Sequence, residues 1–175
     1  MSSFYFWHWR ICVLMRLNKG AFYYCSSLTS ITIPDSVTSI GSSAFHGCSS
    51  LTSITIPDSV TSISYYSIFC GCSSLTSITI LDGVTYIDGD AFYGCNSLTS
   101  ITIPNSVRVV GSSAFYGCSS LEKVFFKGTA SEWKNVYIDR NNNRLTDAKR
   151  YYYSESRPVE SGNYWHYVDG EIVIW

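Results

Sequence analysis

Thiols are the most reactive groups that the sequence offers, and five of them recur at one position of an internal repeat. They lie 23 or 24 residues apart, at Cys25, Cys48, Cys72, Cys95 and Cys118. If the repeats stack, neighbouring thiols stand about 4.8 Å apart, which permits a disulfide and invites a metal interpretation. The position falls between an apolar Phe and the next Leu, however, where Cys acts as a small buried hydrophobe. We therefore predict a column of buried free thiols, with Cys12 and Cys70 outside it and Cys70 the more exposed.

A histidine near one of these thiols suggests nucleophilic catalysis. His46 precedes Cys48 by two residues, and a base beside a thiol can activate it. The equivalent positions in the other repeats hold Tyr23, Cys70, Tyr93 and Tyr116. The histidine thus belongs to one repeat, and His166, within an aromatic stretch, is interpreted as packing. Without a localised cluster of His, Asp and Glu, we expect no enzyme activity, no metal site and no cofactor.

Acidic side chains form a second column directly after the predicted strands. Its members are Asp35, Asp58, Asp82 and the neutral Asn105. Stacked carboxylates suggest calcium, whereas Asp and Asn also cap tight turns. We favour the turn role, because Asn105 can cap a turn without charge. The segment 139–143 resembles the start of a calcium loop, but Arg144 and Arg150 occupy the places of the required Gly and Glu.

The elements that position these residues come from a repeat of 23 or 24 residues. Copies begin at Leu28, Leu51, Leu75, Leu98 and Leu121. The full copies follow the pattern L-x-x-I-x-I-P-x-x-V-x-x-I-G-x-x-A-F-x-G-C-x-x, in which alternating Ile residues predict a strand with one buried face. Such a period is typical of a solenoid, because no single unit can enclose its own apolar side chains. We predict about five stacked coils, with one inserted residue between Ser64 and Ser67.

The two ends of the chain differ from the repeats. We divide the sequence into an irregular N-terminal segment, a solenoid and a C-terminal cap, over residues 1–13, 14–126 and 127–175. In the cap, Thr129 and Glu132 have capping-box spacing, which predicts a short helix over about 130–137.

The remainder of the cap is predicted to be a loop followed by strands. Asn141 to Asn143 predict the loop, and residues 148–154 and 164–175 predict strands. An Asp169–Gly170 hairpin turn interrupts the second of these. The cap is therefore expected to be a mixed α/β structure that covers the end of a β-rich solenoid.

Composition limits the partners. The chain has 175 residues, a formal net charge of −1 and 14% charged residues, whereas nucleic acid binding needs clustered Lys and Arg. We expect neither nucleic acid binding nor membrane insertion, since no stretch approaches the roughly 18 apolar residues of a membrane span. The N-terminus, interrupted by Arg10 and Arg16, shows no signal peptide pattern. The chain is then cytoplasmic, or its export signal lies outside this sequence.

The repeat letters resemble the BspA-like leucine-rich repeats of bacterial surface proteins, which some protozoan parasites also carry. The resemblance covers residues 14–126, and Leu81 departs from it where the family has proline. The tail, with GTASEWKNV and GNYWHYVDGEIVIW, resembles the segment that follows such repeats in proteins of gut Firmicutes. The resemblance implies a right-handed solenoid of the leucine-rich-repeat type, an extracellular or cell-surface location, and adhesion or protein binding.

Places where the repeat varies are the candidates for specificity, because the Ser and Thr side chains of the strands form a smooth, nearly identical ladder. The candidate partner-binding residues are Tyr23, His46, Tyr65, Tyr66, Tyr86, Tyr93, Arg108 and Tyr116. We predict a non-enzymatic protein-binding or adhesion module. Its expected partner is a protein, with host and matrix proteins among the candidates and a glycan as a further option. A structural spacer in a longer repeat protein and a weak carbohydrate-binding module are the alternatives.

Overall fold

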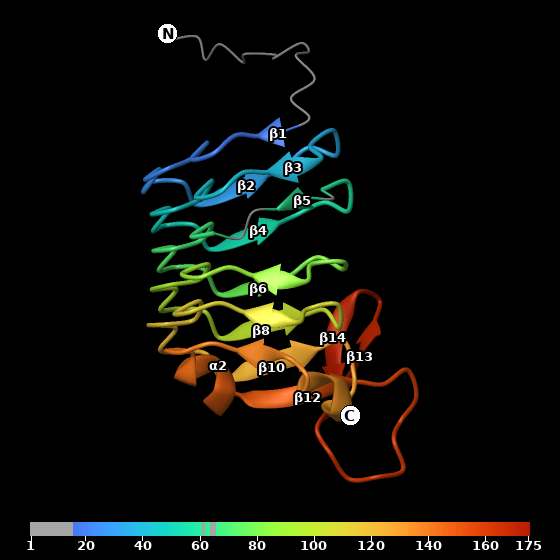
Figure 1. Ribbon diagram of the computed structural model, residues 1–175. Helices are drawn as coiled ribbons and strands as arrows, with labels where there is room; N and C mark the ends of the chain where they lie inside the picture. Colours follow the sequence, from blue (N-terminus) through green and yellow to red (C-terminus); the bar gives the residue numbers. More distant parts are fainter. Residues whose placement is uncertain (1–15, 61, 64–65) are drawn as a thin grey trace, which may run out of the picture.

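The computed structural model describes residues 16–60, 62–63 and 66–175. Segment 1–13, which includes Cys12, and the residues Leu14 and Tyr65 lie outside the described residues. The chain winds into a solenoid of about six stacked coils (Figure 1), one more than the sequence predicts. None of the described helices is long and apolar enough to cross a bilayer.

Two rows of short parallel strands form two sides of the solenoid (Figure 1). The first row contains β2 (Ser30–Thr32), β4 (Ser53–Thr55), β6 (Ser77–Thr79), β8 (Ser100–Ile103) and β10 (Lys123–Phe126). The second contains β1 (Arg16–Leu17), β3 (Ser39–Ile40), β5 (Ser62–Ile63), β7 (Tyr86–Ile87), β9 (Val109–Val110) and β11 (Tyr137–Ile138). Residues at the same repeat position pair with each other in neighbouring strands, as Ile31 pairs with Ile54.

The third side of each coil is a tight turn that carries the letters A-F-x-G-C, and we call these turns together the turn column. Its rings stack over five coils, at Phe22, Phe45, Phe69, Phe92 and Phe115, with centroids 5.2 to 5.6 Å apart. Backbone bonds run the same way, as from Phe69 N–H to the carbonyl of Ala91 at 2.9 Å. Gly47 has a φ of +73° and approaches the Tyr24 ring so closely that a Cβ would lie 2.7 Å from it. The turn column thus joins successive coils without interruption from the first to the fifth.

The strand rows, in contrast, divide between the third and fourth coils. β2 and β4 form one sheet, and β6 begins a separate six-stranded sheet, so no ladder joins β4 to β6. The second row divides in the same way, between β5 and β7. Contact remains at the start of the strands, where Thr76 N–H donates to the carbonyl of Thr52 at 3.2 Å. We call this break between β4 and β6 the seam.

The sixth coil keeps the path of the repeat, but it loses the repeat letters after its first strand, where Leu121, Val124 and Phe126 still fit the pattern. β10 and β11 continue the two rows, α1 (Ala130–Trp133) connects them, and α2 (Asn143–Asp147) follows β11. The predicted capping box is confirmed, because Glu132 N–H donates to Thr129 Oγ1 at 3.2 Å and Thr129 N–H donates to Glu132 Oε2 at 2.7 Å. The helix α1 ends earlier than predicted. The predicted loop was wrong at Asn143, where α2 begins and brings Leu145 into the core.

Asn142 completes the turn column at its last coil. Its Oδ1 accepts the Phe115 N–H at 2.9 Å, in place of the backbone carbonyl that each earlier Phe finds in the next coil. Its Nδ2 donates to the carbonyls of Gly111 and Asp139, both at 2.9 Å. The side chain is fully enclosed. One amide therefore satisfies backbone groups that a further repeat would otherwise have to satisfy.

The chain ends in a hairpin on the outer face of the first strand row. β12 (Lys149–Tyr153) pairs with β10, and β13 (Tyr164–Val168) and β14 (Glu171–Ile174) form the hairpin predicted at Asp169–Gly170. Phe125 takes the outward position that Thr102 has in β8. Trp165, fully buried, packs on Phe125 with ring centroids 5.5 Å apart. This contact builds a small second core outside the solenoid.

Replacing Asn142 tests how the array ends. Asn142→Ala should lower the free energy of unfolding by about 1–3 kcal/mol, because it leaves the buried Phe115 N–H without its acceptor and leaves the Gly111 carbonyl with the Ala114 N–H alone. Asn143→Ala is the matched control, since Asn143 is exposed and should change stability by less than about 0.5 kcal/mol. Urea unfolding of both variants measures the difference. Equal, small effects would show that Asn142 does not close the column.

Candidate functional site

One large groove lies over the outer face of the first strand row, with a volume of about 1150 Å³. Hydroxyl side chains of three strands line it, at Ser53, Thr55, Ser77, Thr79, Ser100 and Thr102. The C-terminal hairpin contributes a wall that includes Tyr167, Gly170 and Ile172. The segment after β6 contributes further lining from residues 81–86 and from Asp88. The groove therefore combines the smooth hydroxyl ladder with two places where the repeat is broken.

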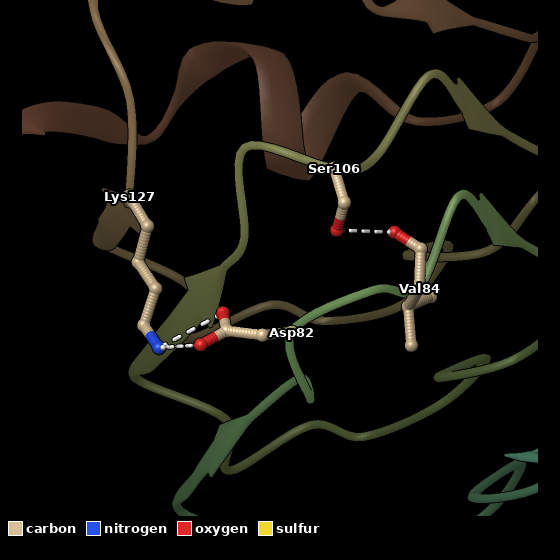
Figure 2. A network of polar contacts seen from close by, with 4 residues as sticks. All are labelled: Asp82, Val84, Ser106 and Lys127. Carbon is tan, nitrogen blue, oxygen red and sulfur yellow. Dashed lines mark hydrogen bonds and ion pairs between the residues drawn. The ribbon is translucent and has the colours of Figure 1, made fainter. Parts of the chain in front are cut away.

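An ion pair crosses two coils at the edge of the groove. Lys127 Nζ, after β10, lies 3.0 Å from both carboxylate oxygens of Asp82, after β6 (Figure 2). The Asp82 side chain is 73% exposed, so the pair contributes at most about 1 kcal/mol to stability. Asp35 and Asp58 make no side-chain hydrogen bond to any described residue. The predicted turn-capping role is therefore not seen, and the backbone closes the turn instead, as from Val60 N–H to the Pro57 carbonyl at 3.0 Å.

The charge of the groove is negative. Four carboxylates line it, from Asp58, Asp82, Asp88 and Glu171, against the single ammonium group of Lys127. Partial burial raises the pKa of Asp88 above its ordinary value, and a hydrogen bond from the Tyr66 backbone opposes this rise. At neutral pH the groove is thus an acidic surface on a chain whose overall charge is close to zero.

The candidate residues predicted from the sequence lie on different sides of the solenoid. Four of them form a ridge on the turn column, which we call the aromatic ridge, and it contains the exposed Tyr23, Tyr93 and Tyr116 and the half-buried His46. Tyr23 stacks on His46 with centroids 4.8 Å apart, and Tyr93 stacks on Tyr116 at 5.1 Å. Cys70 separates the two pairs, because it takes the same repeat position.

The remaining candidates do not join the aromatic ridge. Tyr86 lines the groove. Arg108 lies outside it and donates from Nη1 to the carbonyls of Asn105 and Val107, at 2.6 and 3.1 Å. Tyr66 is exposed beside the turn column. Tyr65 is not among the described residues.

Sequence reasoning missed most of the groove. Asp58, Asp88, Lys127, Tyr167 and Glu171 line it, and none of them was a candidate binding residue. The missing information was the return of the hairpin over the outer face. A signal for it exists in the sequence, since Phe125 and Tyr151 replace Thr at outward strand positions and must be covered.

Four of the recurring thiols form a buried ladder. Each donates to the carbonyl of the Phe in the preceding coil, and the four donors are Cys48, Cys72, Cys95 and Cys118, with distances of 3.1 to 3.2 Å. The prediction of burial was wrong for Cys25, which is exposed because it lies in the first described coil, with no described neighbour before it. Cys70 is half-buried, and its predicted greater exposure than Cys12 stays a prediction, because Cys12 lies outside the described residues. The six described cysteines are all free.

The buried thiols are poor nucleophiles. Burial raises the pKa of Cys48 to about 11 and those of Cys72 and Cys118 to about 12. The Cys48 thiol points to the Phe22 carbonyl, so it does not form the predicted alternative of a pair with His46. His166 stacks on Trp175 with centroids 3.9 Å apart, as expected of a packing residue. Within the described ranges, no group of three or more His, Cys, Asp or Glu residues is placed to hold a metal ion.

Alkylation tests the ladder. At pH 8, iodoacetamide should label Cys25 and, more slowly, Cys70, while Cys48, Cys72, Cys95 and Cys118 react only after unfolding. The free energy of unfolding should be constant below pH 9 and fall as the pH rises from 9 towards 12, because only the unfolded chain then releases these protons. Peptide mass mapping, with a urea-unfolded sample as control, measures the labelling. Equal rates at Cys72 and Cys25 would contradict the ladder.

Comparison with known protein families agrees with the repeat architecture described above. The family model described as "BspA type Leucine rich repeat region (6 copies)" matches residues 15–144. No curated protein matches the chain.

Three solved structures resemble the chain. A leucine rich cell surface protein of Faecalibacterium prausnitzii shares 41% identity over 71% of this chain and 33% of its own, with a TM-score of 0.67. A leucine rich repeat protein of T. pallidum shares 36% over 63% and 51%, with a TM-score of 0.55. A leucine-rich repeat protein of Eubacterium ventriosum shares 26% over 67% and 30%, with a TM-score of 0.51. The chain spans about a third to a half of the length of these proteins, and it belongs to the BspA-type leucine-rich repeat family.

Proposed function

We propose that the chain is a non-enzymatic binding module that holds a segment of a partner protein in the groove. The observation that carries this proposal is the groove itself, of about 1150 Å³, built from a hydroxyl floor and tyrosine-bearing edges. Its volume exceeds the roughly 300–1000 Å³ typical of small-molecule pockets. Members of this repeat family are typically binding or adhesion modules, and no reactive cluster lies in the described part of this groove.

The groove lining suits an extended polypeptide. Ser and Thr side chains present hydroxyl groups at each rung, about 4.8 Å apart, and each hydroxyl can donate or accept a hydrogen bond. Tyr86 and Tyr167 add amphipathic contact area, which interfaces favour. The C-terminal cap is part of the site in this proposal, because its hairpin supplies a wall.

We further propose a cell-surface or extracellular location, where such a partner would be a host or matrix protein. The support comes from one similar structure, which is described as a leucine rich cell surface protein. The aromatic ridge lies on the turn column, outside the groove lining, and we propose it as an independent contact. Its exposed tyrosines are of the type enriched at interfaces.

Filling the groove tests the proposal. Thr79→Trp places a large side chain on the groove floor and should weaken binding to the partner at least about tenfold, or 1.4 kcal/mol. Thr32→Trp is the matched control, because Thr32 takes the same exposed repeat position in β2 and does not line the groove. Surface plasmon resonance against purified matrix proteins, beside a glycan array, measures both variants.

The results separate the alternatives. Equal affinities of the two variants would exclude the groove, and loss of binding in Tyr93→Ala or Tyr116→Ala would place the contact on the aromatic ridge. Binding to glycans alone would favour the carbohydrate interpretation. If the chain binds none of the proteins or glycans tested, the result would favour a structural spacer.

A further inference from the structure

The groove reaches the core of the solenoid at the seam. Ile54 and Ile56 of the third coil and Ile80 of the fourth belong to the core, and all three line the groove. Ile54 and Ile56 are each 9% exposed. The equivalent Ile101 and Ile103, in paired strands, are 1% and 0% exposed. At the unpaired edge of β4, Ile54 and Ile56 are therefore slightly uncovered within an otherwise polar floor, whereas Ile80 stays covered.

A missing hydroxyl explains why the coils part at this place. In the turn after the first strand, Ser59 Oγ donates to the Val37 carbonyl at 2.9 Å, and Ser106 Oγ donates to the Val84 carbonyl at 2.8 Å (Figure 2). These bonds tie a coil to the one before it. The equivalent residue of the fourth coil is Gly83, which has no side chain to reach Val60.

The turn that contains Gly83 also has a different backbone. Gly83 has a φ of +86°, in the left-handed region that side-chain-bearing residues avoid. Leu81 replaces the proline of the other copies. The Val84 N–H lies 3.4 Å from the Leu81 carbonyl, against 2.9 Å for Val37 and Pro34 in an unaltered copy. Two substitutions in one repeat thus accompany both the looser turn and the seam.

Carboxylates surround the apolar opening. Asp58 belongs to the third coil and Asp82 and Asp88 to the fourth, while Glu171 approaches from the hairpin. Among the described residues, Lys127 alone forms an ion pair with any of them, and it occupies Asp82. Opposite charge in a partner would therefore be attracted to Asp58, Asp88 and Glu171.

We propose that the groove takes an extended, cationic segment of the partner protein, with one aliphatic side chain inserted at the seam. This inference rests on the proposed function and names the chemistry of the segment. The aliphatic side chain packs against Ile54 and Ile56, and flanking Lys or Arg side chains pair with Asp58 and Glu171. About three residues of extended chain cross from β4 to β8, at roughly 3.3 Å per residue and 4.8 Å per strand. A polyanion would be repelled, and a neutral glycan would carry no positive charge to pair with the carboxylates.

A displayed library of random nine-residue peptides, selected on the immobilised chain, tests the proposal. Enriched peptides should carry Lys or Arg next to Leu, Ile, Val or Met. A synthetic enriched peptide should bind more weakly at 0.5 M than at 0.1 M salt, because salt screens exposed charge pairs. Its binding should be lost in the Thr79→Trp variant.

Two double variants separate the charge from the seam. Leu81→Pro with Gly83→Ser restores the letters of the first two copies, so it should fold, melt at a higher temperature and bind the peptide about tenfold more weakly. Asp58→Asn with Glu171→Gln should weaken binding about fivefold. Glu155→Gln with Glu160→Gln is the matched control, because it removes two exposed carboxylates outside the groove and should leave the affinity unchanged.

The outcomes distinguish the two proposals. Enrichment of neutral or acidic peptides that Thr79→Trp still blocks would overturn the cationic segment and keep the groove. Unchanged affinity in the Leu81→Pro, Gly83→Ser variant, despite its raised melting temperature, would overturn the insertion at the seam. Enrichment that Thr79→Trp does not affect, or no enrichment at all, would overturn both the segment and the groove.

Discussion

The stacking of one turn on the next is the constraint on which the rest of the structure depends. Phenylalanine rings 5.2 to 5.6 Å apart and the backbone bonds beside them hold the coils in a single register. Because the register is fixed there, every other repeat position must form a column of its own. The thiol ladder, the hydroxyl floor and the column of Asp residues are consequences of this register, and none of them has to be specified separately.

The same constraint allows the strand rows to part without separating the coils. In a repeat protein, stability is close to a sum of the intrinsic stabilities of the units and the interfaces between neighbours. The interface between the third and fourth coils lacks its strand ladder and one hydroxyl bond, but it keeps the Phe69–Phe92 stack. The proposed binding site lies at this interface, as expected if a local departure from the folding pattern marks a functional site.

The sequence predicts those features of the fold that the repeat period determines. Alternating Ile residues and the recurring Phe and Cys place the strands, the core and the buried thiols of the full repeats, and the Thr129–Glu132 spacing predicts the start of α1. The part of the sixth coil after β10 could not be predicted from the repeat letters, because it keeps the backbone path with a different sequence. The exposure of Cys25 depends on its place at an end of the described array. The groove depends on a hairpin that returns over the outer face, which is a long-range contact that local pattern does not specify.

Gly83 has a consequence for how such arrays acquire new specificities. Duplication of a unit copies the fold and its inter-coil serine bond together, so a newly made array has no distinctive site. In the proposal made here, a substitution at this turn residue in one copy opens a local recess, while the copies on either side keep their serine bonds. Mutational drift in a single unit can in this way generate a recognition site that selection refines without any change of fold. The position of the altered copy along the array would decide where on the surface that site emerges.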